Sequence, residues 1–318
     1  MARADGRLTE APTHQRRVRV GVLDVRATLA PFGVFRRDPT HAWWPTAFAR
    51  AVRTPAGDGT VRFSWPRPGS SSSDGHVDVD AWGPGASWLL DAAPRWLGCD
   101  DDPSTFDPSS NPRLAELWRR HGRWRLAGSG LVWQELAATI LGQRVTTVDA
   151  MASWRRICRT WGEPAPGPLG LMLPPAPGVI AGSTYVELHR HGVERRRADA
   201  LVTAARRATR LEEAATMPID DALSRLSALP GLGVWTATAT ATLSHGHPDA
   251  VIIGDYGVPT VVSYALTGDA RRVDDERMLE LLEPFRGHRW RVVRLLYNAG
   301  VTPPRRAPRA RNPRIEHL

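Results

Sequence analysis

The stretch LPGLGVWTATATATL (residues 229–243) contains residue types that suit contact with an anion. Gly231 and Gly233 stand between two segments with helical spacing, so the sequence predicts two short helices joined by a hairpin. Backbone N–H groups in the first turn of the second helix lack intrahelical acceptors, and the helix dipole favours an anion there. Because glycine has no Cβ, a phosphate can approach those amides closely. The alternative is a tight turn between helices that binds nothing.

A single carboxylate follows the hairpin about twenty residues later. Asp255 lies in VIIGDYGVP, between an apolar run and a turn that ends in proline. At such a position an aspartate can cap the N-terminus of the next helix. It can also stand ionised at the mouth of a cleft and face whatever binds at the hairpin. The residues alone leave both interpretations open.

The charge of the chain favours a polyanionic partner. The net charge is +9 with a sequence pI of about 10.8, which favours nucleic acid first and an acidic membrane surface second. All 42 basic residues are arginine, so any mechanism that needs a lysine Schiff base is excluded. Cys99 and Cys158 are too few for a disulfide framework, a four-thiolate zinc site or an iron–sulfur cluster.

The sequence predicts a protein that neither enters a membrane nor is secreted. Residues 1–17 contain acidic side chains and no apolar core segment, so we expect no secretory signal. No stretch approaches the roughly 18 apolar residues that a membrane span needs. We therefore expect a cytoplasmic protein.

Two kinds of hydrophobic pattern divide the chain. Segments 17–31, 61–66 and 76–83 alternate as strands do, and 84–98 has a helix-like cluster, so residues 17–110 are predicted to form an α+β domain. From about residue 111 the spacing is helical, which predicts a helical domain over 111–302. Predicted helices there are 185–191, 195–210, 220–228, 234–244, 258–267, 276–282 and 290–299. Residues 303–318 read as a basic disordered tail.

Gln143 and Arg144 lie between two helical patterns. Apolar residues precede them at helical spacing, and Thr146 followed by Asp149 resembles a capping box that opens the next helix. We therefore place GQR in the joint between two helices.

Five segments, in order, resemble the helix–hairpin–helix (HhH-GPD) DNA glycosylase superfamily. They are ELAATILGQRVTT, RRRADALVTAAR, LPGLGVWTA, GDYGVP and LEPFRGHRWRVVRLLY. The resemblance covers about residues 111–300 and is closest to the 3-methyladenine DNA glycosylase II branch. It implies a small α+β unit followed by two helical subdomains that flank a cleft. It also implies a monomer that acts on double-stranded DNA in the nucleoid, without a membrane partner.

The resemblance assigns roles to matched residues. Asp255 matches the catalytic aspartate, and Gln143 and Arg144 match the loop that enters the duplex where the target base leaves. Backbone amides that would bind a phosphate belong to Gly231, Gly233 and Thr236. Backbone carbonyls that would hold a monovalent cation, Na⁺ or K⁺, belong to Ser227, Leu229 and Leu232. No other cofactor is expected.

The resemblance also implies an aromatic base pocket. Trp235 would present its indole face to alkylated purines, which carry a positive charge, although a tryptophan at helical spacing can equally belong to the core. Ala239 and Leu296 stand where aromatic residues of this branch are expected. Tyr256 and Trp290 are the substitutes that the sequence offers.

These roles predict a monofunctional glycosylase in base excision repair. Such an enzyme flips the target base out of the duplex, and an ionised Asp255 would stabilise the positive charge that develops on the sugar. Relatives that also cut the strand have a lysine where this chain has Trp235, so the expected product is an abasic site in an intact strand. The alternatives are a DNA lesion-binding protein without activity and a glycosylase for uracil or other deaminated bases.

Overall fold

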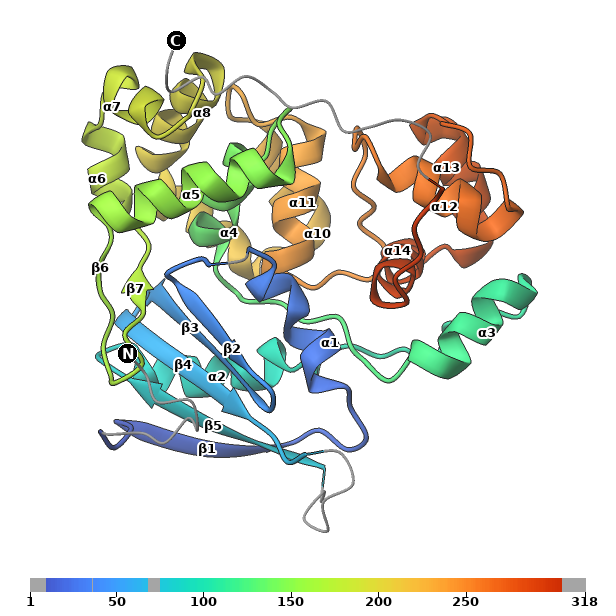
Figure 1. Cartoon of the computed structure of the whole chain (residues 1–318), viewed down its shortest axis with the longest axis horizontal. Helices are drawn as coiled ribbons and strands as arrows, with labels where there is room; N and C mark the ends of the chain where they lie inside the picture. Colours follow the sequence, from blue (N-terminus) through green and yellow to red (C-terminus); the bar gives the residue numbers. More distant parts are fainter. Residues whose placement is uncertain (1–9, 36, 68–74, 305–318) are drawn as a thin grey trace.

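The structure is a computed structural model that describes residues 10–35, 37–67 and 75–304. Most of the predicted tail at 303–318 therefore lies outside the described residues. An antiparallel sheet occupies one side of the molecule and helices make up the remainder (Figure 1). The predicted α+β unit followed by a helical part is confirmed. The exact domain boundaries stay predictions. No described helix is long and apolar enough to cross a membrane.

The sheet has five strands in the order β1-β5-β4-β3-β2, all antiparallel. Their bounds are β1 His14–Arg19, β2 His41–Trp44, β3 Ala47–Thr54, β4 Gly57–Ser64 and β5 His76–Trp82. Helix α2 (Ala86–Trp96) packs on this sheet, and Leu89 and Trp96 form its buried contact with Phe63 and Val79. Two-residue strands β6 (Glu163–Pro164) and β7 (Met172–Leu173) pair beside β3.

The predicted strand over 17–31 is wrong beyond Arg19. Asp24 caps a short helix, α1 (Val25–Leu29), by accepting a hydrogen bond from the amide of Ala27 at 2.9 Å. A 3-10 turn, η1 (Ala30–Gly33), follows it. Strands β2 and β3 were not predicted, because β3 (AFARAVRT) is rich in alanine and arginine and both of its faces are largely covered.

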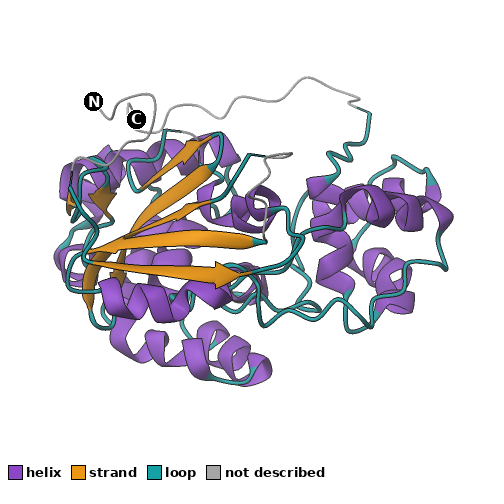
Figure 2. Cartoon of the chain, turned by 90° about the horizontal axis from the view of Figure 1, so that it is seen from below, coloured by secondary structure: helices purple, strands orange, loops and turns teal. Residues whose placement is uncertain are grey.

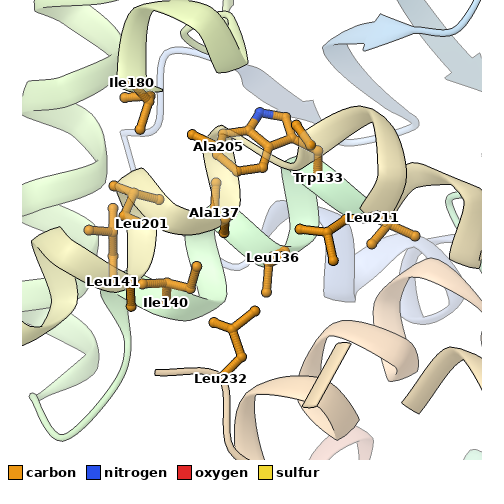
Figure 3. Close-up of a cluster of buried hydrophobic side chains, with 14 of the residues drawn as sticks. Trp133, Leu136, Ala137, Ile140, Leu141, Ile180, Leu201, Ala205, Leu211 and Leu232 are labelled. Carbon is orange, nitrogen blue, oxygen red and sulfur yellow. The ribbon is translucent and has the colours of Figure 1, made fainter. Parts of the chain in front are cut away.

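One group of helices surrounds α4 (Val132–Leu141), which is buried on nearly every side. Its neighbours are α5 Thr147–Trp161, α6 Pro177–Gly182, α7 Tyr185–Arg190, α8 Arg195–Ala205, α9 Ala208–Glu212, η2 Glu213–Thr216, α10 Ile219–Ser227 and α11 Val234–Ser244. Figure 3 shows the apolar cluster that these helices share, which includes Leu136, Ile140 and Leu201. The single helix predicted over 195–210 is in fact α8 and α9, with a break at 206–207.

A second group lies beyond the first and has its own apolar core (Figures 1 and 2). It consists of α3 Pro112–His121, α12 Val258–Thr267, α13 Asp275–Leu282, η3 Glu283–Phe285 and α14 Arg289–Asn298. Helix α3 is distant in sequence, yet it packs against α12 and α14. The loop between α11 and α12 therefore connects the two helical groups, and Asp255 lies in that loop.

Candidate functional site

The hairpin between α10 and α11 has two glycines that serve different purposes. Gly231 has φ +86°, a left-handed conformation, and a Cβ there would lie 2.8 Å from the Cβ of Ala200 on α8. The backbone conformation and the packing against Ala200 therefore require glycine at position 231, whether or not a ligand binds. Gly233 is the N-cap of α11 with φ −79°, and a Cβ there would meet no atom within 4 Å. Of the two glycines, only Gly233 leaves open space for the close approach by a ligand that the sequence predicts.

The first turn of α11 presents its amides at an anchored position. Leu232 is 2% exposed and packs into the cluster of the first helical group (Figure 3). The first helical hydrogen bond to Gly233 comes from the amide of Ala237. Gly233 and Val234 are exposed, whereas Thr236 is buried, so the exposed donors lie nearer the start of the helix than Thr236.

Gln143 and Arg144 lie in the joint between α4 and α5, as the sequence predicted, and the structure places this joint against the hairpin. Thr146 is the N-cap of α5, where its side chain accepts a hydrogen bond from the amide of Asp149. The Nε2 of Gln143 donates to the carbonyl of Gly231 at 3.0 Å and to Oγ1 of Thr236 at 2.7 Å. Gln143 therefore fixes the loop to the hairpin. Arg144, the next residue in the loop, is exposed to solvent and has φ +55°.

Asp255 combines the two roles that the sequence left open. Its Oδ1 accepts hydrogen bonds from the amides of Gly257 at 2.8 Å and Val258 at 3.0 Å, so it caps α12. Its Oδ2 accepts a hydrogen bond from Nε1 of Trp235 at 3.2 Å. This bond joins α11 of the first helical group to the start of the second. The amide of Gly254 donates to Oδ2 of Asp275 at 2.8 Å and ties the same loop to α13.

Trp235 is half-buried between the two loops. A Cβ built on Gly142 would lie 3.5 Å from the indole, and one built on Gly254 would lie 3.8 Å from the Cβ of Trp235, so a glycine of each loop lies beside this side chain. The side chain therefore sits at the joint and is absent from the apolar cores described above.

Tyr297 is a residue of this site that the sequence did not reveal. Burial and the nearby charge of Asp255 raise the pKa of Tyr297 to about 12, while 43% of the residue stays exposed. The aromatic position expected at Leu296 is thus one residue further along α14, because Leu296 is fully buried. Helical spacing from Trp290 and Val293 puts Tyr297 on the buried face of α14, so no pattern in the sequence marked it, and its place in the last turn leaves it partly exposed.

Two of the predicted pocket residues are in the wrong place. Trp290 is 5% exposed and belongs to the core of the second helical group, so it does not line an open pocket. Tyr256 is 79% exposed, and the guanidinium carbon of Arg272 lies 4.5 Å from its ring centroid. Tyr256 therefore faces solvent beside Asp255, and the guanidinium of Arg272 lies over its ring. Both errors arise because the spacing within a helix or turn does not give its rotation.

The predicted cation site involves main-chain oxygens only. Within the described residues, no three His, Cys, Asp or Glu side chains are grouped as metal ligands. The carbonyl of Leu229 accepts a hydrogen bond from the amide of Leu232 at 3.0 Å, which closes the hairpin. A carbonyl oxygen has two lone pairs, so this bond leaves one for a cation. The cation site at the carbonyls of Ser227, Leu229 and Leu232 stays a prediction.

The known proteins to which this chain is similar are DNA glycosylases. No family model matches the chain. The DNA-3-methyladenine glycosylase 2 of Escherichia coli is 27% identical over 158 residues, covering 48% of this chain and 56% of the relative. The match thus spans only about half the length of that relative.

Solved structures show the same fold over nearly the whole chain. The 3-methyladenine DNA glycosylase from Archaeoglobus fulgidus has a TM-score of 0.74 at 19% identity and covers 90% of this chain and 98% of its own. An 8-oxoguanine glycosylase/lyase from Clostridium acetobutylicum, bound to double-stranded DNA, has a TM-score of 0.67 at 13% identity, covering 91% and 96%. The chain thus shares the fold of these DNA glycosylases, with the hairpin and the aspartate at the joint between its two helical groups, and the predicted resemblance is confirmed at the level of the fold.

Proposed function

We propose that this protein is a monofunctional DNA glycosylase that excises alkylated purines, of the 3-methyladenine and 7-methylguanine type, from duplex DNA. One observation carries the proposal: the carboxylate of Asp255 is bonded to Trp235, which lies in the first turn of the hairpin helix. The anion-binding end of α11 and the carboxylate are thereby held in fixed relation. A strand bound at the hairpin would present a nucleotide to Asp255.

The hairpin and the α4–α5 joint suit a DNA duplex from which a base is flipped. Exposed amides at Gly233 and Val234 would bind a phosphate, and the net charge of +9 adds attraction that does not depend on sequence. Arg144 stands beside them without a hydrogen bond or ion pair to another described residue. Its planar guanidinium is suited to fill the gap left by the base and to stack there.

The chemistry needs a negative charge and a flat binding surface. Cleavage of the N-glycosidic bond builds positive charge on the sugar, which an ionised Asp255 would stabilise. Trp235 and Tyr297, one from each helical group, would flank the flipped base. Alkylated purines carry a positive charge, which an aromatic face attracts. Because the charged base is already a good leaving group, no general acid is required. The two helical groups would then form the two walls of the base-binding cleft.

The product would be an abasic site in an intact strand. The chain has no lysine, so the imine chemistry that cuts the strand has no lysine nucleophile here. We expect a monomer acting in DNA repair. A Na⁺ or K⁺ ion on the carbonyls of Ser227, Leu229 and Leu232 would add positive charge beside the bound phosphate.

The test is release of free bases from methylated duplex DNA by the wild type and by Asp255→Asn. Asparagine keeps an oxygen that caps α12, removes the charge, and replaces Oδ2 by an NH₂ group that cannot accept the hydrogen bond from Nε1 of Trp235. We expect the rate of base release to fall about 10²- to 10³-fold while DNA affinity is kept. Asp24→Asn is the matched control, because Asp24 caps α1 in the same way and lies on the N-terminal unit.

Three results would change the assignment. Release by Asp255→Asn at the wild-type rate would refute the catalytic role. DNA binding without release of any base by the wild type would favour the lesion-binding alternative. Release of uracil but of no alkylated purine would favour the glycosylase for deaminated bases.

A further inference from the structure

A pocket of about 500 Å³ lies between the end of α12 and the start of α13, and the proposed chemistry does not use it. Figure 1 shows both helices in the second helical group. Hydroxyl and charged side chains line most of it: Ser263, Thr267, Asp269, Arg271, Arg272 and Arg277. Three arginines against one aspartate make the lining cationic. A pocket of this composition favours an anion that accepts several hydrogen bonds.

Arg272 differs from the other two arginines of the pocket. Arg271 is bonded to Asp269 through Nε and Oδ2 at 2.9 Å, and Arg277 to Glu280 at 2.7 Å. Arg272 has no acidic partner among the described residues, and its guanidinium lies over the ring of Tyr256. The ring covers one face of the guanidinium and leaves the N–H groups at its edge available. Arg272 is therefore an exposed cation. The ring of Tyr256 supports its guanidinium, whose N–H groups are available to a ligand.

The pocket is tied to the loop that carries Asp255. Tyr256, which supports Arg272, is the next residue after Asp255. The bond from the amide of Gly254 to Asp275 fixes the other side of the same loop to α13. Asp255 is in turn bonded to Trp235 on the hairpin helix. The pocket is thus linked to the loop that carries Asp255 through Tyr256, and the hairpin helix is linked to the carboxylate itself through Trp235.

We propose that Arg272 and the pocket beneath it bind a phosphodiester of the strand that contains the damaged nucleotide, on the opposite side of that nucleotide from the hairpin. This inference rests on the proposed function. A flipped nucleotide loses its stacking and pairing, and a strand held at both flanking phosphates offsets part of that cost. The planar fork of arginine matches the two free oxygens of a phosphodiester.

The first experiment measures affinity for a duplex with an abasic analogue at several salt concentrations. Arg272→Ala should weaken binding about 3- to 10-fold and reduce the slope of log K against log salt by about 0.9, the value for one lost phosphate contact. Arg17→Ala is the matched control. Arg17 is an exposed arginine of β1, and its substitution removes the same charge from the sheet. Tyr256→Phe should behave as the wild type, whereas Tyr256→Ala should lose part of the affinity because Arg272 loses its support.

The second experiment identifies the phosphate. One phosphodiester at a time is replaced by a neutral methylphosphonate on each side of the abasic analogue. At one position the replacement should weaken the wild type by the same factor as Arg272→Ala and have no further effect on that variant. A hairpin variant, Gly233→Glu, should stay sensitive at that position.

The outcomes separate the inference from the proposed function. Equal affinity and equal salt slope for Arg272→Ala and the wild type would overturn the inference while base release stands. A loss that Arg17→Ala reproduces would also overturn it, because net charge alone would explain the effect. Failure of the wild type to bind DNA would overturn both. A loss of affinity that is specific to Arg272→Ala, and that disappears when one particular phosphate is neutral, would support the inference even if the excised base were of another kind.

Discussion

Trp235→Phe separates the two contributions that Trp235 is proposed to make. The substitution removes the indole N–H that donates to Oδ2 of Asp255 at 3.2 Å and keeps an aromatic face for the base. The two bonds from Gly257 and Val258 to Oδ1 remain, so the capping of α12 is retained. Asp255 would then be held through Oδ1 only, and Oδ2 would lose the bond that fixes its direction.

The expected effect follows from the geometry. Hydrogen bonds to charged groups contribute about 1.5–3 kcal/mol, and a length of 3.2 Å lies at the long end of the normal range. The lower figure, about 1.5 kcal/mol, corresponds to about a tenfold loss in the rate of base release. Because a phenyl ring remains, DNA affinity and KM should change less than about threefold. Trp235→Ala should reduce both the rate and the affinity for the damaged site.

The assay is single-turnover base release from a duplex with one alkylated purine, with affinity measured in parallel by fluorescence anisotropy. A Trp235→Phe rate equal to the wild type would refute the view that the indole positions Asp255. A raised KM with an unchanged kcat would show that Trp235 acts through substrate binding alone.

Three other predictions concern the site and the fold. Tyr297→Ala should weaken discrimination for the alkylated base about tenfold or more in competition binding, whereas Tyr297→Phe should not, since stacking needs only the ring. Burial alone would raise the pKa of Asp249, but the hydrogen bonds from Arg289 outweigh it and lower that pKa. Stability from this pair is present above about pH 4 and is lost as the pH falls further, so urea unfolding of Asp249→Asn should show a weaker loss of stability between pH 5 and pH 3. The buried pair of Arg50 and Glu135, with bonds of 2.7 and 3.1 Å, joins the sheet to α4; Arg50→Met should cost about 3–5 kcal/mol in urea unfolding, and adding Glu135→Leu should restore most of it.

Local signals in the sequence predicted the helices of the site well. The hairpin glycines, the helix at 234–244, the helix at 258–267 and the cap at Thr146 all depend on residues within one turn of each other. Helical periodicity and capping chemistry act over that range, so they are readable without the fold. The position of Gln143 against the hairpin is a contact between distant segments, and the sequence did not predict it.

The errors concern side-chain direction and long-range packing. Trp290 and Tyr297 lie seven residues apart on α14, yet one is buried and the other is half-exposed beside Asp255. Residues seven apart share a face of a helix, so the difference comes from their positions along α14, and the spacing does not encode how far α3 and α12 cover each end of that face. Likewise β3 was missed because its alanines are buried by neighbours from distant parts of the chain.

The two glycines of the hairpin differ in why the position is occupied by glycine. Gly231 is required by its left-handed backbone and by Ala200, so its substitution would damage the fold whether or not DNA binds. Gly233 has an ordinary backbone and open space around it, so the fold itself would accept a side chain there. A variant at Gly233 therefore reports on DNA binding, whereas a variant at Gly231 reports on both binding and stability. Loss of function at Gly231 alone would leave the proposed phosphate contact undecided, and a stable, inactive Gly233 variant would not.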